Sequence, residues 1–187
     1  ELLNEGNLRG LLYETGRPLE DAILEALSIL GFEAERYEDG ESEFDAVFSS
    51  PEGRFLGEAE GRDNRAIAID KLSQLERNLQ EDFAREEVSD FAKGVLFGNA
   101  FRLRPLDERT EFFTEKCFTS AKRAKVVLVR TTDLFRVAKH LKENKSEAFA
   151  RKCRESLMAT EGEVVVFPEP PSSKRSGSTT STTAVKD

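Results

Sequence analysis

Apolar residues recur every three or four positions along residues 17–30, which is the spacing of an amphipathic helix. Pro18 stands in the expected first turn and Gly31 follows the last apolar residue, so both ends of this helix are marked. A second stripe of this kind, over residues 69–87, consists of Leu72, Leu75, Leu79 and Phe83. Further helices are expected at residues 114–125, from the capping residue Thr132 onward, and at residues 146–159.

Short apolar segments bounded by turn residues predict the strands. Residues 93–100 and 126–130 are continuous apolar runs, which are typical of strands covered on both faces. Residues 44–49 and 55–60 flank the sequence Ser-Ser-Pro-Glu-Gly-Arg, whose proline and glycine indicate a hairpin connection. Two further strands are expected, at residues 32–37 and 164–167.

The order of these elements predicts an α/β fold with a mixed central sheet. A helix, three strands, a helix, a strand, a helix and a strand imply a sheet whose first part is antiparallel and whose faces carry helices. With 187 residues, 38% of them hydrophobic, the chain is long enough for one domain, which we assign to residues 1–167. Residues 168–187 are rich in Ser, Thr and Pro and have no apolar period, so they are predicted to be a disordered tail.

Charge is unevenly distributed along the chain. Residues 1–70 contain 18 Asp and Glu against 6 Lys and Arg, whereas residues 71–187 contain 18 against 22. Affinity for nucleic acid comes largely from Lys and Arg that neutralise phosphates. A polyanion is therefore expected to contact the C-terminal half, and the acidic half would be solvated or would hold a cation.

Other global features of the sequence favour a cytoplasmic protein. The sequence contains no apolar run of about 18 residues or more and no signal-peptide pattern. Because it begins at Glu1 without a methionine, we expect a fragment that leaves room for an upstream domain. Cys117 and Cys153 lack zinc-binding spacing and are expected to be buried, reduced thiols.

Three carboxylates, those of Asp45, Glu58 and Glu60, interrupt the apolar pattern of the predicted hairpin. If the turn is centred on Glu52 and Gly53, Asp45 lies opposite Glu60. Side chains alternate along a strand, so the three acids share one face. The other face is then predicted to hold Phe44, Ala46, Phe48, Phe55 and Ala59.

A cation among the three acids is one explanation for this arrangement, because like charges that face each other destabilise a sheet. Carboxylate oxygens are hard ligands that suit Mg²⁺ or Mn²⁺. The alternative is a hairpin face that is exposed to water, on which acids need no ligand.

These acids and the order of the elements resemble the PD-(D/E)XK nuclease superfamily, whose members have the restriction-endonuclease-like fold. In that fold a helix precedes a three-stranded meander, which a helix and a further strand follow. Asp45 matches the first acid of the motif, Glu58 matches the second, and Glu60 stands where lysine is usual. The resemblance covers roughly residues 15–130 and implies an αβββαβ core.

The resemblance also implies site residues on the helices. Glu20 or Glu25 on the first helix is similar to the acid that many members carry there, which would join the metal ligands. Gln74 on the second helix lies where some members have a glutamine.

Glu60 departs from the motif, so a cation from elsewhere would be needed beside the attacking water. Lys71, at the start of the second helix, is the first candidate, and Arg62, just past the strand, is the next. A solvated lysine at a helix end is the alternative interpretation of Lys71.

The segment FRLRPLDER, residues 101–109, is a predicted loop whose arginines lie between Phe101 and the later pair Phe112 and Phe113. Basic residues among phenylalanines are typical of a surface that binds nucleic acid, and here they are Arg102, Arg104 and Arg109. Alternatively, the phenylalanines anchor an ordinary loop to the core.

The leading hypothesis is therefore a Mg²⁺- or Mn²⁺-dependent nuclease that hydrolyses phosphodiester bonds, with DNA as the favoured substrate. The second hypothesis is a non-catalytic domain of the same fold that binds nucleic acid or a protein. The third is an interaction module whose acidic face contacts a basic partner. A homodimer is compatible with each of them.

Overall fold

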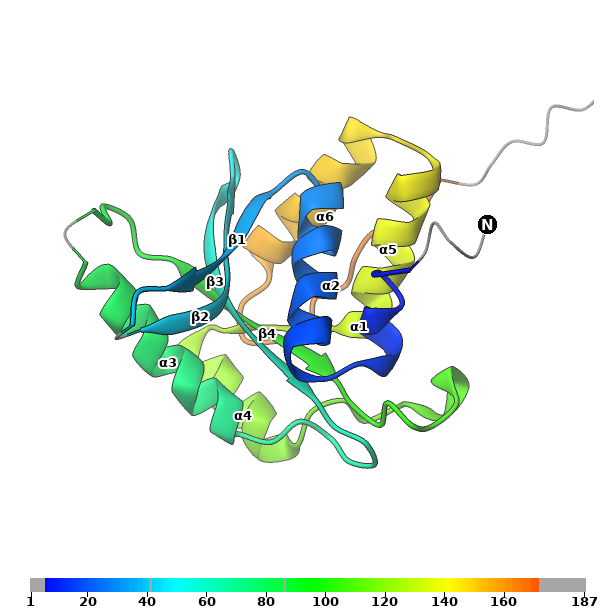
Figure 1. The fold of residues 1–187 in the computed structure, drawn as a ribbon, viewed down its shortest axis with the longest axis horizontal. Helices are drawn as coiled ribbons and strands as arrows, with labels where there is room; N and C mark the ends of the chain where they lie inside the picture. Colours follow the sequence, from blue (N-terminus) through cyan, green and yellow to red (C-terminus); the bar gives the residue numbers. More distant parts are fainter. Residues whose placement is uncertain (1–5, 41, 86, 172–187) are drawn as a thin grey trace, which may run out of the picture.

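A five-stranded mixed sheet with the strand order β1-β2-β3-β4-β5 forms the centre of the protein (Figure 1). The computed structural model describes residues 6–40, 42–85 and 87–171. The first three strands form an antiparallel meander, and β3, β4 and β5 run parallel to one another. The strands are β1 (Glu33–Glu38), β2 (Glu43–Ser50), β3 (Gly53–Gly61), β4 (Lys93–Asn99) and β5 (Val127–Arg130).

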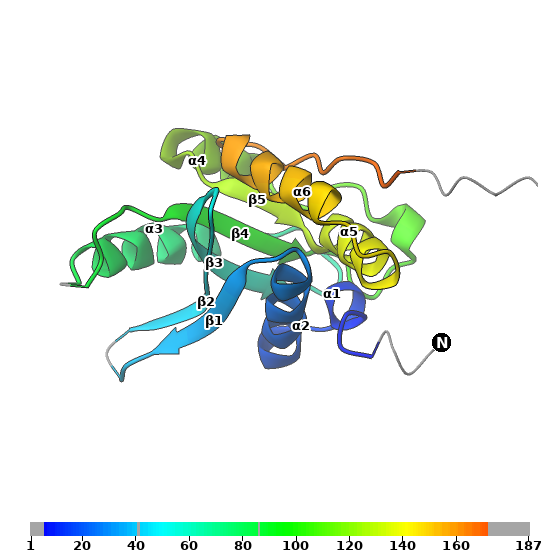
Figure 2. The same ribbon diagram turned by 90° about the horizontal axis from the view of Figure 1, so that it is seen from above.

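Helices cover both faces of this sheet (Figures 1 and 2). One face carries α1 (Gly10–Tyr13), α2 (Gly16–Ile29), α5 (Thr131–Glu143) and α6 (Glu147–Ala159). The other face carries α3 (Asp70–Phe83) and α4 (Glu115–Ala124). A short 3₁₀ helix, η1 (Leu106–Glu108), lies in the loop after β4. The predicted α/β class, with a mixed sheet between helices, is confirmed.

The core is double, because each face of the sheet is buried. Along β4, Val95 and Phe97 pack toward α2 and α5, whereas Leu96 packs toward α3. This alternation within a continuous apolar run is what a strand covered on both faces requires. Cys117 and Cys153 are buried free thiols, as predicted. In the described part of the chain, no helix is long and apolar enough to cross a bilayer.

The helices differ from the predicted ones in one additional helix and in two boundaries. The short helix α1 was not predicted, and α3 ends at Phe83 rather than at residue 87. Helix α5 begins two residues early, at Thr131, so Arg130 rather than Thr132 is at its cap position. The buried Thr131 hydroxyl donates instead to the Gly98 carbonyl, at 3.3 Å, and ties α5 to the end of β4.

The segment after α6 forms less sheet than predicted. Residues 164–167 contribute only an isolated bridge, between Val164 and Leu128 of β5. Residues 168–171 have no regular structure, but Glu169 forms an ion pair with Arg136 of α5 at 3.0 Å. The remainder of the predicted tail, residues 172–187, lies outside the described residues.

The β2–β3 hairpin turns one residue earlier than the sequence predicts, which shifts the pairing of the two strands by two residues. Ser50 pairs with Gly53 and Ala46 with Gly57, so the prediction that Asp45 lies opposite Glu60 is wrong. A shift of two residues keeps every side chain on its own face of the sheet. It brings Asp45 next to Glu58 instead.

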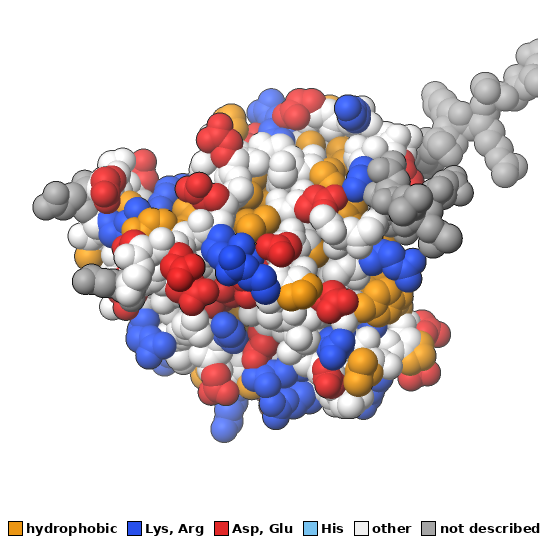
Figure 3. Space-filling model, viewed as in Figure 1, with side chains coloured by type: hydrophobic (Ala, Val, Ile, Leu, Met, Phe, Trp, Pro, Cys, Tyr) orange, Lys and Arg blue, Asp and Glu red, His pale blue; other side chains and the backbone are white. Residues whose placement is uncertain are grey.

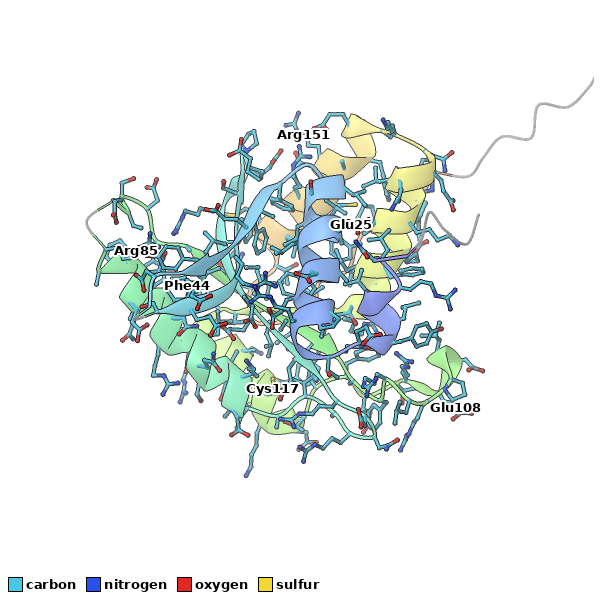
Figure 4. All side chains as sticks on the ribbon, in the orientation of Figure 1. Glu25, Phe44, Arg85, Glu108, Cys117 and Arg151 are labelled. Atoms are coloured by element: carbon cyan, nitrogen blue, oxygen red, sulfur yellow. The ribbon has the colours of Figure 1, made fainter. Side chains whose placement is uncertain are left out.

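A bulge in β2 gives Asp45 its orientation. Between the pairs Glu35–Val47 and Tyr37–Phe44, the single residue Arg36 of β1 lies opposite two residues, Asp45 and Ala46. An extra residue in a strand bends it and re-aims the neighbouring side chains. The predicted face is therefore wrong for Phe44, which is labelled in Figure 4. It stacks on Tyr37 on the α3 side of the sheet, while Ala46 and Phe48 face the opposite core.

Candidate functional site

Glu58 is a fully buried carboxylate in the middle of β3, on the face that α3 covers. Its Oε2 accepts a hydrogen bond from Lys71 Nζ at 3.2 Å, and its Oε1 accepts one from Asn78 Nδ2 at 2.6 Å. A buried carboxylate is stable only when such partners replace water. Helix α3 supplies both partners, because Lys71 and Asn78 are two turns apart and so share one face.

Asp45 lies beside Glu58 on the neighbouring strand. Its Oδ2 accepts a hydrogen bond from the backbone N–H of Ala59 at 2.8 Å, which fixes the carboxylate against β3. Asp45 is 9% exposed and so contacts solvent, whereas Glu58 has no exposed surface. Two acids from adjacent strands are thus held together at one point, which we call the Asp45–Glu58 pair.

The electrostatics of the pair reflect this crowding. Burial, and then the nearby Asp45 carboxylate, raise the pKa of Glu58 to about 8, and the Lys71 ammonium opposes them. Burial lowers the pKa of Lys71, but the carboxylates of Glu58, Asp45 and Glu60 raise it by more. The pKa of Lys71 is therefore above its ordinary value. Lys71 is therefore a cation held by the acids, not the solvated helix-end lysine of the alternative interpretation.

Asn78 is the site residue that the sequence interpretation missed. It lies within the apolar stripe of α3, next to Leu75 and Leu79, and is only 7% exposed. A polar residue on the buried side of an amphipathic helix is the signal that could have identified it, because a buried amide needs a partner. The predicted residue Gln74 lies on the same side of α3, between Lys71 and Asn78, and is half-buried.

Glu60 was predicted to lie with Asp45 and Glu58, but its ion-pair partner is Arg62. One of its oxygens contacts the Arg62 guanidinium in an ion pair, and its side chain is 10% exposed. Burial raises the pKa of Glu60, against the effects of Arg62 and Lys71. Its Oε2 is buried and has no hydrogen-bond partner among the described residues, and the same holds for Arg62 Nε.

A divalent cation fits this site through two carboxylates, not three. The described residues contain no group of three or more His, Cys, Asp or Glu side chains arranged to hold a metal ion, so the expected convergence of three acids is wrong. Mg²⁺, however, commonly binds through one or two carboxylates and completes its shell with water and substrate phosphate. The Asp45–Glu58 pair offers that donor set, and the unpartnered Glu60 Oε2 is a further oxygen nearby.

The two candidate acids on the first helix are engaged elsewhere. Glu20 binds Arg36 of β1 at 3.0 Å, in an ion-pair cluster that also contains Asp21. Glu25, labelled in Figure 4, binds Lys142 of α5 at 2.9 Å. The structure thus gives each of them a structural partner and does not bring Glu25 to the pair.

Two loops at the carboxyl ends of β3 and β4 carry a group of arginines. Backbone hydrogen bonds join the loops, from Arg102 N to Arg62 O at 2.9 Å and from Phe101 N to Arg65 O at 3.3 Å. Between them lies an open hollow of about 520 Å³, lined by Thr15, Gly61, Arg62, Asp63, Asn64, Arg65 and Arg102. Arg65 was not among the predicted contacts, and we call Arg62, Arg65 and Arg102 the arginine rim.

The arginines of the predicted 101–109 loop differ in their availability. Arg102 binds Asp63 at 2.7 Å, and Arg104 is exposed and lies over the Phe101 ring at 4.4 Å. Arg109 is buried, and its guanidinium donates to the carbonyls of Arg102 and Leu12 at 2.6 and 2.7 Å. It holds the loop in place and has no surface for a phosphate. Figure 3 shows Lys and Arg side chains along the lower edge of the molecule in that view.

Comparison of the whole fold decides its class. The restriction endonuclease FokI superposes with a TM-score of 0.55 at 10% identity, over 86% of this chain and 30% of FokI. The structure of FokI bound to DNA superposes with a TM-score of 0.56 at 11% identity, over 88% of this chain and 30% of FokI. The chain has the restriction-endonuclease-like fold.

The chain thus spans about a third of the length of the FokI structures it resembles. No protein-family model and no curated protein sequence matches it. At this identity the likeness extends to the fold, and the chemistry must be argued from the residues of the chain itself.

Replacing Glu58 by glutamine is expected to stabilise the fold near neutral pH, by about 1 kcal/mol. The pKa of Glu58 is raised to about 8, so the folded state holds a proton that the unfolded chain releases, and stability falls as pH rises from the ordinary value of 4.5 to about 8. Glutamine imitates the protonated acid and keeps an acceptor for Asn78.

Urea denaturation at about pH 5 and about pH 8 measures this effect. The gain in stability of Glu58→Gln over the wild type should be larger at the higher pH. The control Glu35→Gln, which changes an exposed residue of β1, should show no such dependence on pH. A Glu58→Gln variant that is less stable than the wild type at the higher pH would contradict the assignment of Glu58 as a strained acid.

Proposed function

We propose that this chain is a metal-dependent nuclease domain that hydrolyses phosphodiester bonds, with DNA as its substrate. The observation that carries the proposal is the Asp45–Glu58 pair, two acids from adjacent strands with the amine of Lys71 at 3.2 Å from Glu58. The restriction-endonuclease-like fold supports it, and the FokI structure bound to DNA favours DNA over RNA.

In this proposal the Asp45–Glu58 pair would hold Mg²⁺ or Mn²⁺, and Glu60 would add a ligand or an acid–base group. The bound ion would lower the pKa of a water molecule and neutralise charge on the phosphate. Asn78 fixes the rotamer of Glu58 through its 2.6 Å hydrogen bond, so that the carboxylate keeps its direction.

The cationic groups have a different role. Lys71 would orient the attacking water and approach the scissile phosphate, in place of the lysine that Glu60 replaces. The arginine rim and Arg104 would bind the phosphates on either side, since guanidinium groups match phosphate geometry. Arg62 connects the two parts of the site, because it also contacts Glu60.

A cleavage panel tests this function. The purified protein is incubated with single- and double-stranded DNA and RNA, with Mg²⁺, with Mn²⁺ and with a chelator. We expect metal-dependent cleavage of at least one DNA substrate. Equal cleavage in the chelator, or cleavage of RNA alone, would contradict the metal dependence or the substrate respectively.

One observation favours a second candidate, a non-catalytic domain of this fold that binds nucleic acid. The position where lysine is usual holds Glu60, which pairs with Arg62, and both oxygens of Glu58 are bound by α3. Binding of DNA without cleavage under every metal condition would establish this candidate.

A further inference from the structure

Lys71 stands where a cation would bind the acids. Its Nζ donates to Glu58 Oε2, and its charge is also attracted by Asp45 and Glu60. From this geometry we infer that Lys71 is an internal counter-ion that a metal ion must displace. The inference rests on the proposed metal site, and it adds that the lysine limits how tightly the free protein binds metal.

The oxygens of the pair show why displacement is required. Glu58 Oε1 accepts from Asn78, which is buried, and Oε2 accepts from Lys71, which is partly exposed, so Oε2 is the Glu58 oxygen that a metal ion would reach once Lys71 moves away. Mg²⁺ binds oxygen at about 2.0 to 2.1 Å. An ammonium group on the same oxygen would lie close to the ion, and two cations at such a separation repel strongly in a half-buried site.

The position of Lys71 allows it to move away. It is the second residue of α3, and its long side chain is 28% exposed. Asn78, in contrast, is buried two turns further along the helix and would stay in place. Metal loading would thus free one amine beside the site without disturbing Glu58.

The consequence is a coupling between metal and phosphate. A phosphate that accepts a hydrogen bond from the displaced Lys71 ammonium would offset the loss of the Lys71–Glu58 ion pair. Nucleic acid should therefore favour metal binding. The free protein should then bind metal weakly.

Mn²⁺ binding to the full chain, measured by titration calorimetry without nucleic acid, tests this inference. Lys71→Met should bind Mn²⁺ about tenfold more tightly than the wild type, or better, because the competing charge is gone. Lys152→Met is the matched control: it removes the same charge from an exposed position of α6, on the opposite face of the sheet, and should leave the affinity within about twofold.

Lys71→Gln serves as a second variant, because it removes the charge but keeps a donor for Glu58 and so protects the fold. It should also tighten Mn²⁺ binding. Equal or weaker binding in the folded variants would overturn the inference, as would no binding by any protein. If the variants bind Mn²⁺ more tightly but the wild type cleaves no substrate, Lys71 is a counter-ion and the proposed nuclease function is contradicted. If the wild type cleaves DNA but the variants bind Mn²⁺ with unchanged affinity, the nuclease function is supported and the counter-ion role of Lys71 is contradicted.

Discussion

Replacing Asp45 by asparagine is expected to lower the rate of metal-dependent cleavage by about a thousandfold. The substitution removes one of the two charges that would hold the ion, and a bound metal contributes several kcal/mol to stabilising the transition state. The fold should survive, because asparagine keeps an oxygen that accepts the 2.8 Å hydrogen bond from the Ala59 N–H. Initial rates on the best substrate of the cleavage panel measure the loss.

Asp90→Asn is the control for this change. Asp90 is exposed and precedes the amino-terminal end of β4, whereas Arg102 of the arginine rim follows the carboxyl end of that strand. Its substitution should leave the rate within about twofold. If Asp45→Asn retained most of the wild-type rate while remaining folded, the Asp45–Glu58 pair would not be the catalytic centre.

Replacing Arg154 by methionine is expected to destabilise the fold by about 3 kcal/mol. Arg154 is nearly buried, and its guanidinium joins three elements: it donates to Glu52 of the hairpin at 2.8 Å, to the Leu30 carbonyl at 2.8 Å and to Glu147 of α6 at 2.7 Å. Methionine leaves these acceptors without a partner. Chemical denaturation measures the difference.

This effect should also depend on pH. The Arg154 guanidinium lowers the pKa of Glu52 from 4.5 to about 2, so the stabilisation is complete above the ordinary value and is lost as pH falls toward the lower one. The difference between the wild type and Arg154→Met should therefore shrink in acid. Arg151→Met, which removes an exposed arginine of the same helix, should cost about 0.5 kcal/mol or less, and equal losses in both variants would contradict the structural role of Arg154.

Most of the fold could be predicted from local patterns. The apolar stripe of α2 and the continuous apolar runs of β4 and β5 are each visible within one short segment of the sequence. The structure confirms all three elements. Residues 164–167 are also apolar but form only a single bridge, from Val164 to Leu128 of β5. Apolar character alone does not make a strand.

The candidate site was less predictable, because its geometry depends on events between elements. The acids Asp45 and Glu58 could be selected from the sequence, but their adjacency depends on a two-residue register shift and on a bulge opposite Arg36. Neither feature has a strong local signal. Asn78 shows the same limit, since its role depends on which strand α3 covers.

Arginines illustrate the remaining difficulty. Arg102 and Arg109 lie in one loop and look equivalent in the sequence, yet one lines the open hollow and the other is buried against backbone carbonyls. Arg65 joins the rim because its loop pairs with the loop after β4 through backbone hydrogen bonds. Long-range pairing of this kind decides which charges face a ligand.

The most direct test of the proposed catalytic centre compares the wild type with Glu58→Gln in one cleavage assay with Mg²⁺. We expect the wild type to cut DNA and the variant, although it is at least as stable, to leave DNA intact. This combination would exclude unfolding as the cause of the loss. Cleavage by both proteins at similar rates, or by neither, would contradict the assignment of Glu58 to a working metal site.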